Sequence, residues 1–109
     1  MRTSVKRVAT LPSNTDGMTC DSQNNLFMTA LQLNGVMLRD AKTGEVSTYV
    51  SHPDMSWPDT LGWGPDGNLY LVTGHLHLWV DGVMNFDKSA GPNFRIWKIQ
   101  ADRQSYTAK

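Results

Sequence analysis

Apolar and polar residues alternate along most of the chain with the two-residue period of β-strands. The clearest case is residues 46–51, where valine or threonine at every second position alternates with Ser47, Tyr49 and Ser51. Similar short patterns, ended by residues typical of turns, predict strands at residues 5–11, 17–20, 26–31, 36–39, 46–51, 60–63, 68–73 and 94–99. We find no helical spacing longer than one turn. The pattern therefore predicts an all-β fold.

Two regions of the chain are close copies of each other. Residues 16–27, DGMTCDSQNNLF, return as residues 59–70, DTLGWGPDGNLY, 43 positions later. Both copies begin with an aspartate, Asp16 and Asp59, and both contain Asn-Leu followed by an aromatic residue near the end. A repeat of about 40–45 residues, built from short strands and tight turns, is typical of a β-propeller blade.

The repeat extends beyond these copies. Residues 5–12 align with residues 46–53, and residues 34–39 align with residues 93–98. The second alignment requires a 16-residue insertion in the second unit, within residues 74–92, which contains His75, His77, Trp79, Asp81 and Gly82. Insertions in repeat proteins usually form loops on one face, which is often the binding face.

These alignments predict how the chain is organised. We expect residues 1–99 to be a partial β-propeller, followed by a polar, frayed tail at residues 100–109. Residues 5–12 would be the outer strand of a preceding blade, residues 13–52 a complete blade, and residues 57–99 the last blade with its long insertion at 74–92. The predicted fold is therefore two antiparallel four-stranded blades, a fragment of a six-bladed propeller, whose last blade obtains its fourth strand from elsewhere.

Incomplete blades leave strand edges open, and open edges favour association with another chain. We therefore expect this chain either to be the C-terminal part of a longer protein or to associate with itself. With eight strands per chain, three copies could close a six-bladed ring.

Composition and charge exclude several partners. The chain has 109 residues, of which 39% are hydrophobic and 18% charged, and its ten basic and ten acidic residues cancel. This balance argues against binding to nucleic acid or to an acidic membrane surface. No apolar run reaches the roughly 20 residues of a membrane span, and residues 1–10 do not form a signal peptide. The single cysteine, Cys20, cannot form an intrachain disulfide.

Three motifs, in this order, resemble the closing blades of the major royal jelly protein/yellow family. They are residues 15–27 and 57–70, which include the two copies, and PNFRI at residues 92–96. The resemblance covers residues 5–99. It implies a six-bladed propeller whose channel binds a small molecule, and it is the only indication of an extracellular, secreted location.

A more distant resemblance connects the Asp-Gly-Met element at residues 16–18 with gluconolactonases. It implies that Asp16 binds a divalent metal, usually calcium, in the central channel. The other metal ligands expected from that group, a Glu and Asn residues from earlier blades, have no counterpart in this chain.

Candidate ligand-binding residues stand where the two units begin. Asp16 and Asp59 precede the first strand of each unit, which in propellers lies nearest the axis, so both are expected at the channel mouth. The alternative is that both carboxylates cap turns by accepting backbone N–H groups. His75 and His77 lie on one side of an extended segment and are also expected at the channel mouth. Because no third ligand stands at a diagnostic spacing, we expect rim histidines rather than a zinc site.

Other residues of the repeats are expected to be structural. Asp21 and Asp66 lie in the turns after the first strands, and Trp57, Trp63 and Trp97 are expected to pack between blades. The sequence contains no supported Ser/His/Asp arrangement, no phosphate-binding loop and no cysteine pair, so we assign no catalytic residue.

Three functional hypotheses remain open. The first is a royal jelly/yellow-like protein that binds a small ligand through the propeller channel. The second is part of a calcium-dependent, gluconolactonase-like hydrolase, in which Asp16 helps to hold the metal that polarises a carbonyl. The third is a truncated chain without independent activity.

Overall fold

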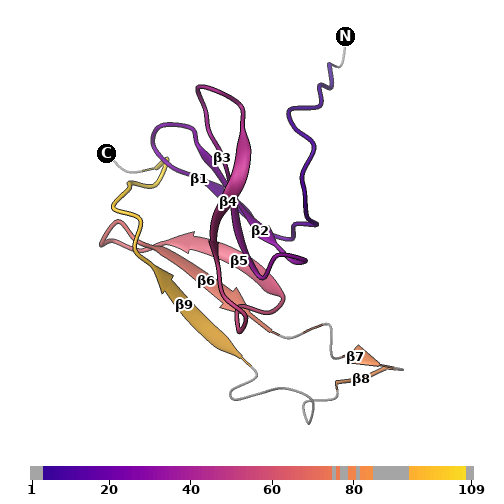
Figure 1. The fold of residues 1–109 in the computed structure, drawn as a ribbon. Helices are drawn as coiled ribbons and strands as arrows, with labels where there is room; N and C mark the ends of the chain where they lie inside the picture. Colours follow the sequence, from indigo (N-terminus) through magenta and orange to yellow (C-terminus); the bar gives the residue numbers. More distant parts are fainter. Residues whose placement is uncertain (1–3, 75, 77–78, 81, 85–93, 108–109) are drawn as a thin grey trace.

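The fold is all-β, as predicted. The computed structural model describes residues 4–74, 76, 79–80, 82–84 and 94–107, and these residues form antiparallel sheets without an α-helix. A four-stranded and a three-stranded sheet lie together, and a two-stranded hairpin of β7 (Trp79–Val80) and β8 (Val83–Met84) projects beyond the second sheet (Figure 1). None of the described residues forms a helix long and apolar enough to cross a bilayer.

The first sheet is a meander of four strands in sequence order. It consists of β1 (Met18–Cys20), β2 (Leu26–Ala30), β3 (Gly35–Arg39) and β4 (Val46–Ser51). The hairpin between β3 and β4 forms as its turn residues predict. Asp40 Oδ1 accepts the backbone N–H groups of Lys42 at 2.8 Å and Thr43 at 2.9 Å, and Gly44 adopts φ +76°.

The second sheet has three strands, not the four of the predicted blade. Its order is β5 (Pro58–Trp63), β6 (Leu69–Thr73) and β9 (Arg95–Ile99). No described residue pairs with the outer edge of β9. Residues 4–11 likewise form no strand, so the outer strand predicted within residues 5–12 is not formed here. The physical reason is that a β-strand needs a hydrogen-bonded neighbour, and this arm has none among the described residues (Figure 1).

The main core lies between the facing sides of the two sheets. Its buried members are Phe27, Val36, Met55, Leu69, Leu71 and Ile99. The Phe27 ring packs edge-on against Tyr49 and Trp63, with centroid distances of 5.2 and 5.4 Å. Trp63 and Trp97 pack against this core, which confirms their predicted packing role. A smaller cluster of Met28, Ala30 and Met37 lies on the other face of the first sheet, where Leu11 covers it.

The repeated asparagines have equivalent positions in the two sheets. Asn25 Oδ1 accepts the N–H of Ala41 at 2.9 Å, and Asn68 Oδ1 accepts the N–H of Ala101 at 3.1 Å. Both asparagines are buried, so each amide oxygen holds the chain just after the third strand of its sheet. The sequence repeat is therefore also a structural repeat.

The strand register corrects one detail of the sequence alignment. Leu26 pairs with Arg39, whereas its counterpart Leu69 pairs with Ile99 and not with the predicted Lys98. A shift of one residue moves a side chain to the opposite face of a strand. Strand β9 is thus displaced by one residue from the alignment of residues 34–39 with 93–98.

Where a residue of the first sheet points into the core between the sheets, the equivalent residue of the second sheet points away from that core. Phe27 is buried in that core, whereas its counterpart Tyr70 lies on the outer side of the second sheet. Conversely, Leu71 is buried in the core, whereas its counterpart Met28 lies on the other face of the first sheet. The sheets therefore stack front to back, which means that one face of the first sheet packs on the opposite, non-equivalent face of the second, as in consecutive repeats.

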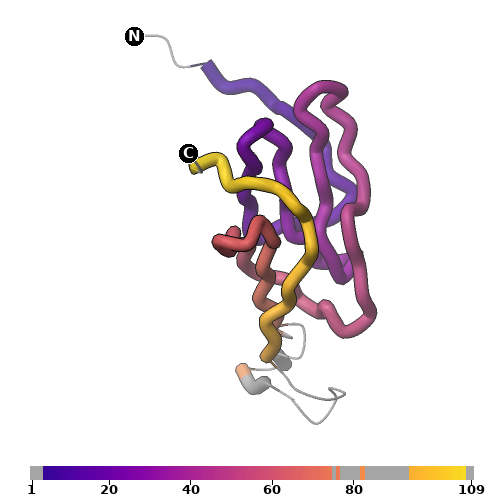
Figure 2. The backbone as a smooth tube through the Cα atoms, turned by 90° about the vertical axis from the view of Figure 1, so that its left-hand side faces the viewer, coloured from indigo at the N-terminus to yellow at the C-terminus, as the bar shows by residue number. Residues whose placement is uncertain are grey.

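The C-terminal segment is not the frayed tail that its polarity predicts. Residues 100–107 continue from β9 past the turn between β5 and β6 to the turn after β1 (Figure 2). Arg103 N–H donates to the Gly67 carbonyl at 3.0 Å, and Ser22 N–H donates to the Gln104 carbonyl at 2.8 Å. Backbone hydrogen bonds therefore join this segment to both sheets.

Candidate functional site

A groove surrounds Trp57 at the end of the sheets where β2 ends and β1 and β5 begin. It consists of two adjoining hollows of about 600 and 310 Å³, which share Asn14, Leu31 and Trp57. The other lining residues are Leu11, Ser13, Thr15 and Asp16 in the larger hollow and Gln32, Asn34 and Ser56 in the smaller. We call this feature the Trp57 groove.

One wall of the groove is held in place by Ser13 and Gln32. Ser13 Oγ lies 2.8 Å from Gln32 Oε1 and accepts the Gln32 N–H at 3.0 Å. Asn14 N–H donates to the same Gln32 Oε1 at 2.6 Å. Since Ser13 is only 8% exposed, this network holds residues 13–14 against the chain that follows β2.

The aspartate predicted at the channel mouth lies in this groove. The backbone N–H groups of Asp16 and Gly17 both donate to Thr29 Oγ1, at 2.9 and 3.0 Å. Thr29 is completely buried, so the loop backbone is anchored to β2 while the Asp16 side chain is exposed. The structure therefore presents this carboxylate to solvent on a fixed support.

Trp57 adopts a backbone conformation that is unusual for a bulky residue. Its φ is +51°, in the left-handed region that favours glycine. Such strain costs of order 1–3 kcal/mol and is found preferentially at functional sites. Trp57 belongs to neither core cluster, in contrast to the predicted packing role, and it lines both hollows of the groove instead.

Asp59 lies next to the groove but does not line it. A Cβ added to Gly17 would clash with the Asp59 carbonyl oxygen and lie 3.1 Å from Thr60 Cα, so the starts of β1 and β5 are in contact. Both Asp16 and Asp59 are exposed, and within the described part of the chain neither forms an ion pair. His75 and His77, the other predicted ligand-binding residues, lie outside the described residues.

The groove does not supply the ligands of a metal site by itself. Calcium takes six to eight oxygen ligands, usually including several carboxylates. Among the described residues, no three His, Cys, Asp or Glu side chains come together, and Asp16 is the single carboxylate that lines the groove. This donor set does not fit calcium, so we derive no chemical step through a metal ion.

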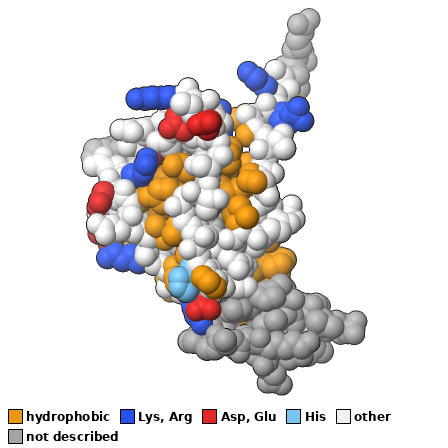
Figure 3. All heavy atoms as spheres, in the orientation of Figure 1, with side chains coloured by type: hydrophobic (Ala, Val, Ile, Leu, Met, Phe, Trp, Pro, Cys, Tyr) orange, Lys and Arg blue, Asp and Glu red, His pale blue; other side chains and the backbone are white. Residues whose placement is uncertain are grey.

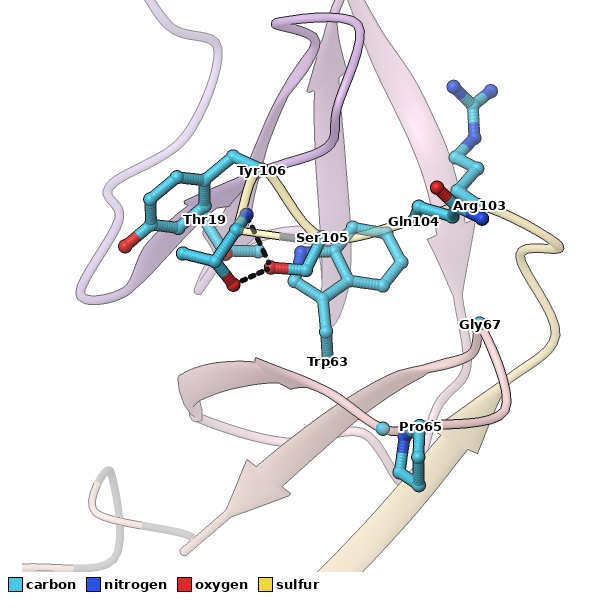
Figure 4. Close-up of a pocket in the computed structure, with 10 residues that line it drawn as sticks. Thr19, Trp63, Pro65, Gly67, Arg103, Gln104, Ser105 and Tyr106 are labelled. Atoms are coloured by element: carbon cyan, nitrogen blue, oxygen red, sulfur yellow. Dashed lines mark hydrogen bonds between the residues drawn. The ribbon is translucent and has the colours of Figure 1, made fainter. Parts of the chain in front are cut away.

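A second hollow, at the opposite end of the sheets, has a structural explanation. It measures about 470 Å³, and Trp63 lies there beneath the C-terminal segment (Figure 4). Trp63 Nε1 donates to the Cys20 carbonyl at 3.1 Å, and Arg103 forms an ion pair with Asp21 at 2.9 Å. These polar groups bind one another, which explains how the segment is attached.

The two turn carboxylates near this hollow are structural, as predicted. Asp21 Oδ1 accepts the N–H groups of Gln23 and Asn25, at 2.9 and 3.0 Å. Burial would raise the pKa of Asp21, but hydrogen bonds from Asn25 and Arg103 outweigh it, and the pKa is lowered. In the second turn, hydrogen bonds from Asn68 lower the pKa of Asp66 well below its usual range.

Comparison with protein-family models gives no match for this chain, and comparison with curated proteins likewise gives none. The groove must therefore be interpreted from its own chemistry.

Sequence reasoning found Asp16 but missed the rest of the groove. Ser13 and Gln32 are 19 positions apart, and no repeat or motif connects them. The sequence predicts a packing role for Trp57, and only the tertiary structure reveals its left-handed backbone and its place in the groove lining.

Proposed function

We propose that this protein is a small-molecule binding module of the β-propeller type, similar to the royal jelly/yellow family, and that the Trp57 groove is its binding site. The observation that supports this most directly is the strained Trp57 beside the exposed, backbone-anchored Asp16. Strain at a bulky aromatic residue in a groove is expected where the side chain must be presented to a ligand.

The lining residues suit a small polyhydroxylated ligand, such as a sugar or sugar lactone. An indole offers a flat apolar surface with a polar N–H at its edge. The Asp16 carboxylate accepts hydrogen bonds from ligand hydroxyls, and the Asn14 amide can both donate and accept. Three of the ten lining residues are apolar and seven are polar, a composition that suits a ligand with many hydroxyl groups better than an apolar one.

Two features support the propeller part of the proposal. The sheets stack front to back, and their first strands begin side by side at Gly17 and Asp59. In a propeller, consecutive blades place their innermost strands next to each other around the axis. Asp16 and the groove would then lie at the mouth of the channel.

Titration with glucose and with glucono-1,5-lactone, followed by NMR chemical shifts, tests the binding site. We expect both compounds to bind, and we expect each of two variants to weaken binding by about tenfold. Asp16→Asn would remove one charge-assisted hydrogen bond, and Trp57→Gly would remove one stacking contact. Glycine is chosen at position 57 because it removes the indole and suits the positive φ.

Asp59→Asn is the matched control, since Asp59 is an exposed aspartate outside the groove lining. It should bind both compounds as the parent protein does. The absence of shifts for groove residues, or equal weakening by Asp59→Asn, would contradict the proposed site.

The alternative function is a calcium-dependent, lactonase-like hydrolase, to which the groove would contribute one exposed carboxylate, Asp16, with the other calcium ligands supplied from outside the described residues. It predicts hydrolysis of glucono-1,5-lactone only when calcium is added, with loss of turnover in Asp16→Ala. Binding of the lactone without turnover, with or without calcium, would leave the binding module as the function.

A further inference from the structure

We propose that the N-terminal arm, residues 4–11, pairs with the open edge of β9 in a second copy of this chain. The arm forms no strand (Figure 1), although Leu11 at its end packs on the first sheet, and β9 has no described neighbour on its outer side. One copy thus offers a segment with strand-forming residues, and the other offers a strand edge with which no described residue pairs. Strand addition to such an edge is a common form of recognition.

The internal repeat identifies the arm as the strand that the second sheet lacks. Residues 5–12 align with residues 46–53, which contain β4. Strand β9 is the third strand of the second sheet, as β3 is of the first, because each pairs with the second strand of its sheet. Since β3 pairs antiparallel with β4, the arm is the expected antiparallel neighbour of β9.

Both partners expose apolar side chains that the association would cover, those of the arm by strand pairing and those of the second sheet by the stacking of sheets. Val5 and Val8 of the arm are 92% and 61% exposed. On the outer side of the second sheet, Ile96 and its cross-strand partner Val72 are 76% and 44% exposed. Figure 3 shows that apolar side chains are not confined to the interior but also reach the molecular surface. Apolar area of this kind would stabilise the complex when removed from water.

Charge does not favour this pairing. The arm contains Lys6 and Arg7 but no acidic residue within residues 4–11, and β9 itself carries Arg95 and Lys98. In the register of β3 and β4, Lys6 lies opposite Lys98, whose ammonium already forms an ion pair with Asp66 at 3.3 Å. The pairing therefore depends on backbone hydrogen bonds and apolar contacts.

The same neighbouring copy would also continue the stacking seen within one chain. The exposed side of the second sheet corresponds to the side of the first sheet that is buried in the core, because equivalent positions face in opposite senses. The first sheet of the next copy can therefore stack on it as the two sheets of one chain stack on each other. This contact uses different surfaces on the two copies, so it produces rings or open chains and not two-fold dimers.

Light scattering and disulfide crosslinking test the proposal. We expect assemblies larger than a dimer at high concentration, and these should dissociate in Val8→Pro, which removes an N–H donor from an arm that neither sheet requires. For crosslinking, one protein carries Ala9→Cys and a second carries Ile96→Cys, with Cys20→Ser in both. We expect a disulfide at least about tenfold faster than in the control, because pairing gives the thiols a high effective concentration.

Ser47→Cys, on the exposed edge strand β4, replaces Ile96→Cys in the matched control. Three results would each overturn the proposal: a monomer at every concentration, equal crosslinking to positions 96 and 47, or association that Val8→Pro leaves unchanged. A closed dimer would also contradict it. Circular dichroism of Val8→Pro identical to that of the parent excludes unfolding as the cause of a change.

Discussion

At the scale of single residues, Asp21 connects more parts of the structure than any sequence motif indicates. Its carboxylate is 2% exposed and accepts hydrogen bonds from Gln23, Asn25 and Arg103. The Arg103 guanidinium also lies over the Phe27 ring, 5.4 Å from its centroid. One buried carboxylate thus joins the turn after β1, the C-terminal segment and the edge of the core.

We expect Asp21→Ala to lower the free energy of unfolding by about 2–4 kcal/mol, because it leaves buried N–H groups and a guanidinium without an acceptor. Urea unfolding at neutral pH measures this change. Asp66→Ala is the matched control, since Asp66 lies in the equivalent turn but its side chain is 37% exposed. A loss in Asp66→Ala as large as that in Asp21→Ala would show that burial does not decide the effect.

The lowered pKa of Asp21 predicts how stability depends on pH. The folded protein binds this proton more weakly than the unfolded chain, in which the carboxyl has its ordinary pKa of 3.8. Its contribution is therefore complete above that pKa and decreases as the pH falls through it towards the folded-state value. When the pH is lowered from about 7 to about 3, we expect the free energy of unfolding to fall less in Asp21→Asn than in the parent protein. Parallel pH curves for the two proteins would contradict this assignment.

At the scale of elements, the contact between β1 and β5 depends on a glycine. Gly17 lies against the backbone of Asp59 and Thr60 so closely that a side chain at this position has no room. The contact joins the first strands of the two sheets, and the same loop carries Asp16 into the groove. Sheet packing and presentation of the groove carboxylate are therefore linked through one short segment.

Gly17→Ala should lower the free energy of unfolding by about 1–3 kcal/mol, because the new methyl group must push β1 and β5 apart. The same variant should weaken sugar binding, since it displaces the Asp16 loop. Gly62→Ala is the control within β5, because a Cβ there meets no atom within 4 Å. Thermal unfolding of both variants gives the comparison, and an equal effect at the two positions would rule out the proposed steric cause.

At the scale of the whole molecule, the interface between the two sheets is buried, whereas other surfaces of the sheets are exposed. The core between the sheets buries Phe27, Leu69 and Leu71 completely. The outer side of the second sheet and the edge of β9 remain open, and the arm has no strand partner among the described residues. Front-to-back stacking explains this asymmetry, because a repeat that packs on only one neighbour leaves its other face available.

The local part of the fold could be predicted from the sequence. Alternating residues and turn signals located the strands of both sheets to within about two residues, because side-chain period and turn chemistry are properties of short segments. The repeat also identified Asn25 and Asn68 as equivalent positions, and it placed Asp16 at the start of a unit. These predictions depend on neighbours close in sequence.

Only the tertiary structure decided the features that depend on distant neighbours. These include the one-residue shift of β9, the absence of strand pairing in the arm and the return of the C-terminal segment to Asp21. The Trp57 groove belongs to the same class, because its walls come from three separate segments, residues 11–16, the β2–β3 turn at 31–34 and residues 56–57. The alternation of side chains shows which segments can form strands. Strand pairing and groove formation also need a neighbouring segment, and only the packing of the whole chain determines which segment that is.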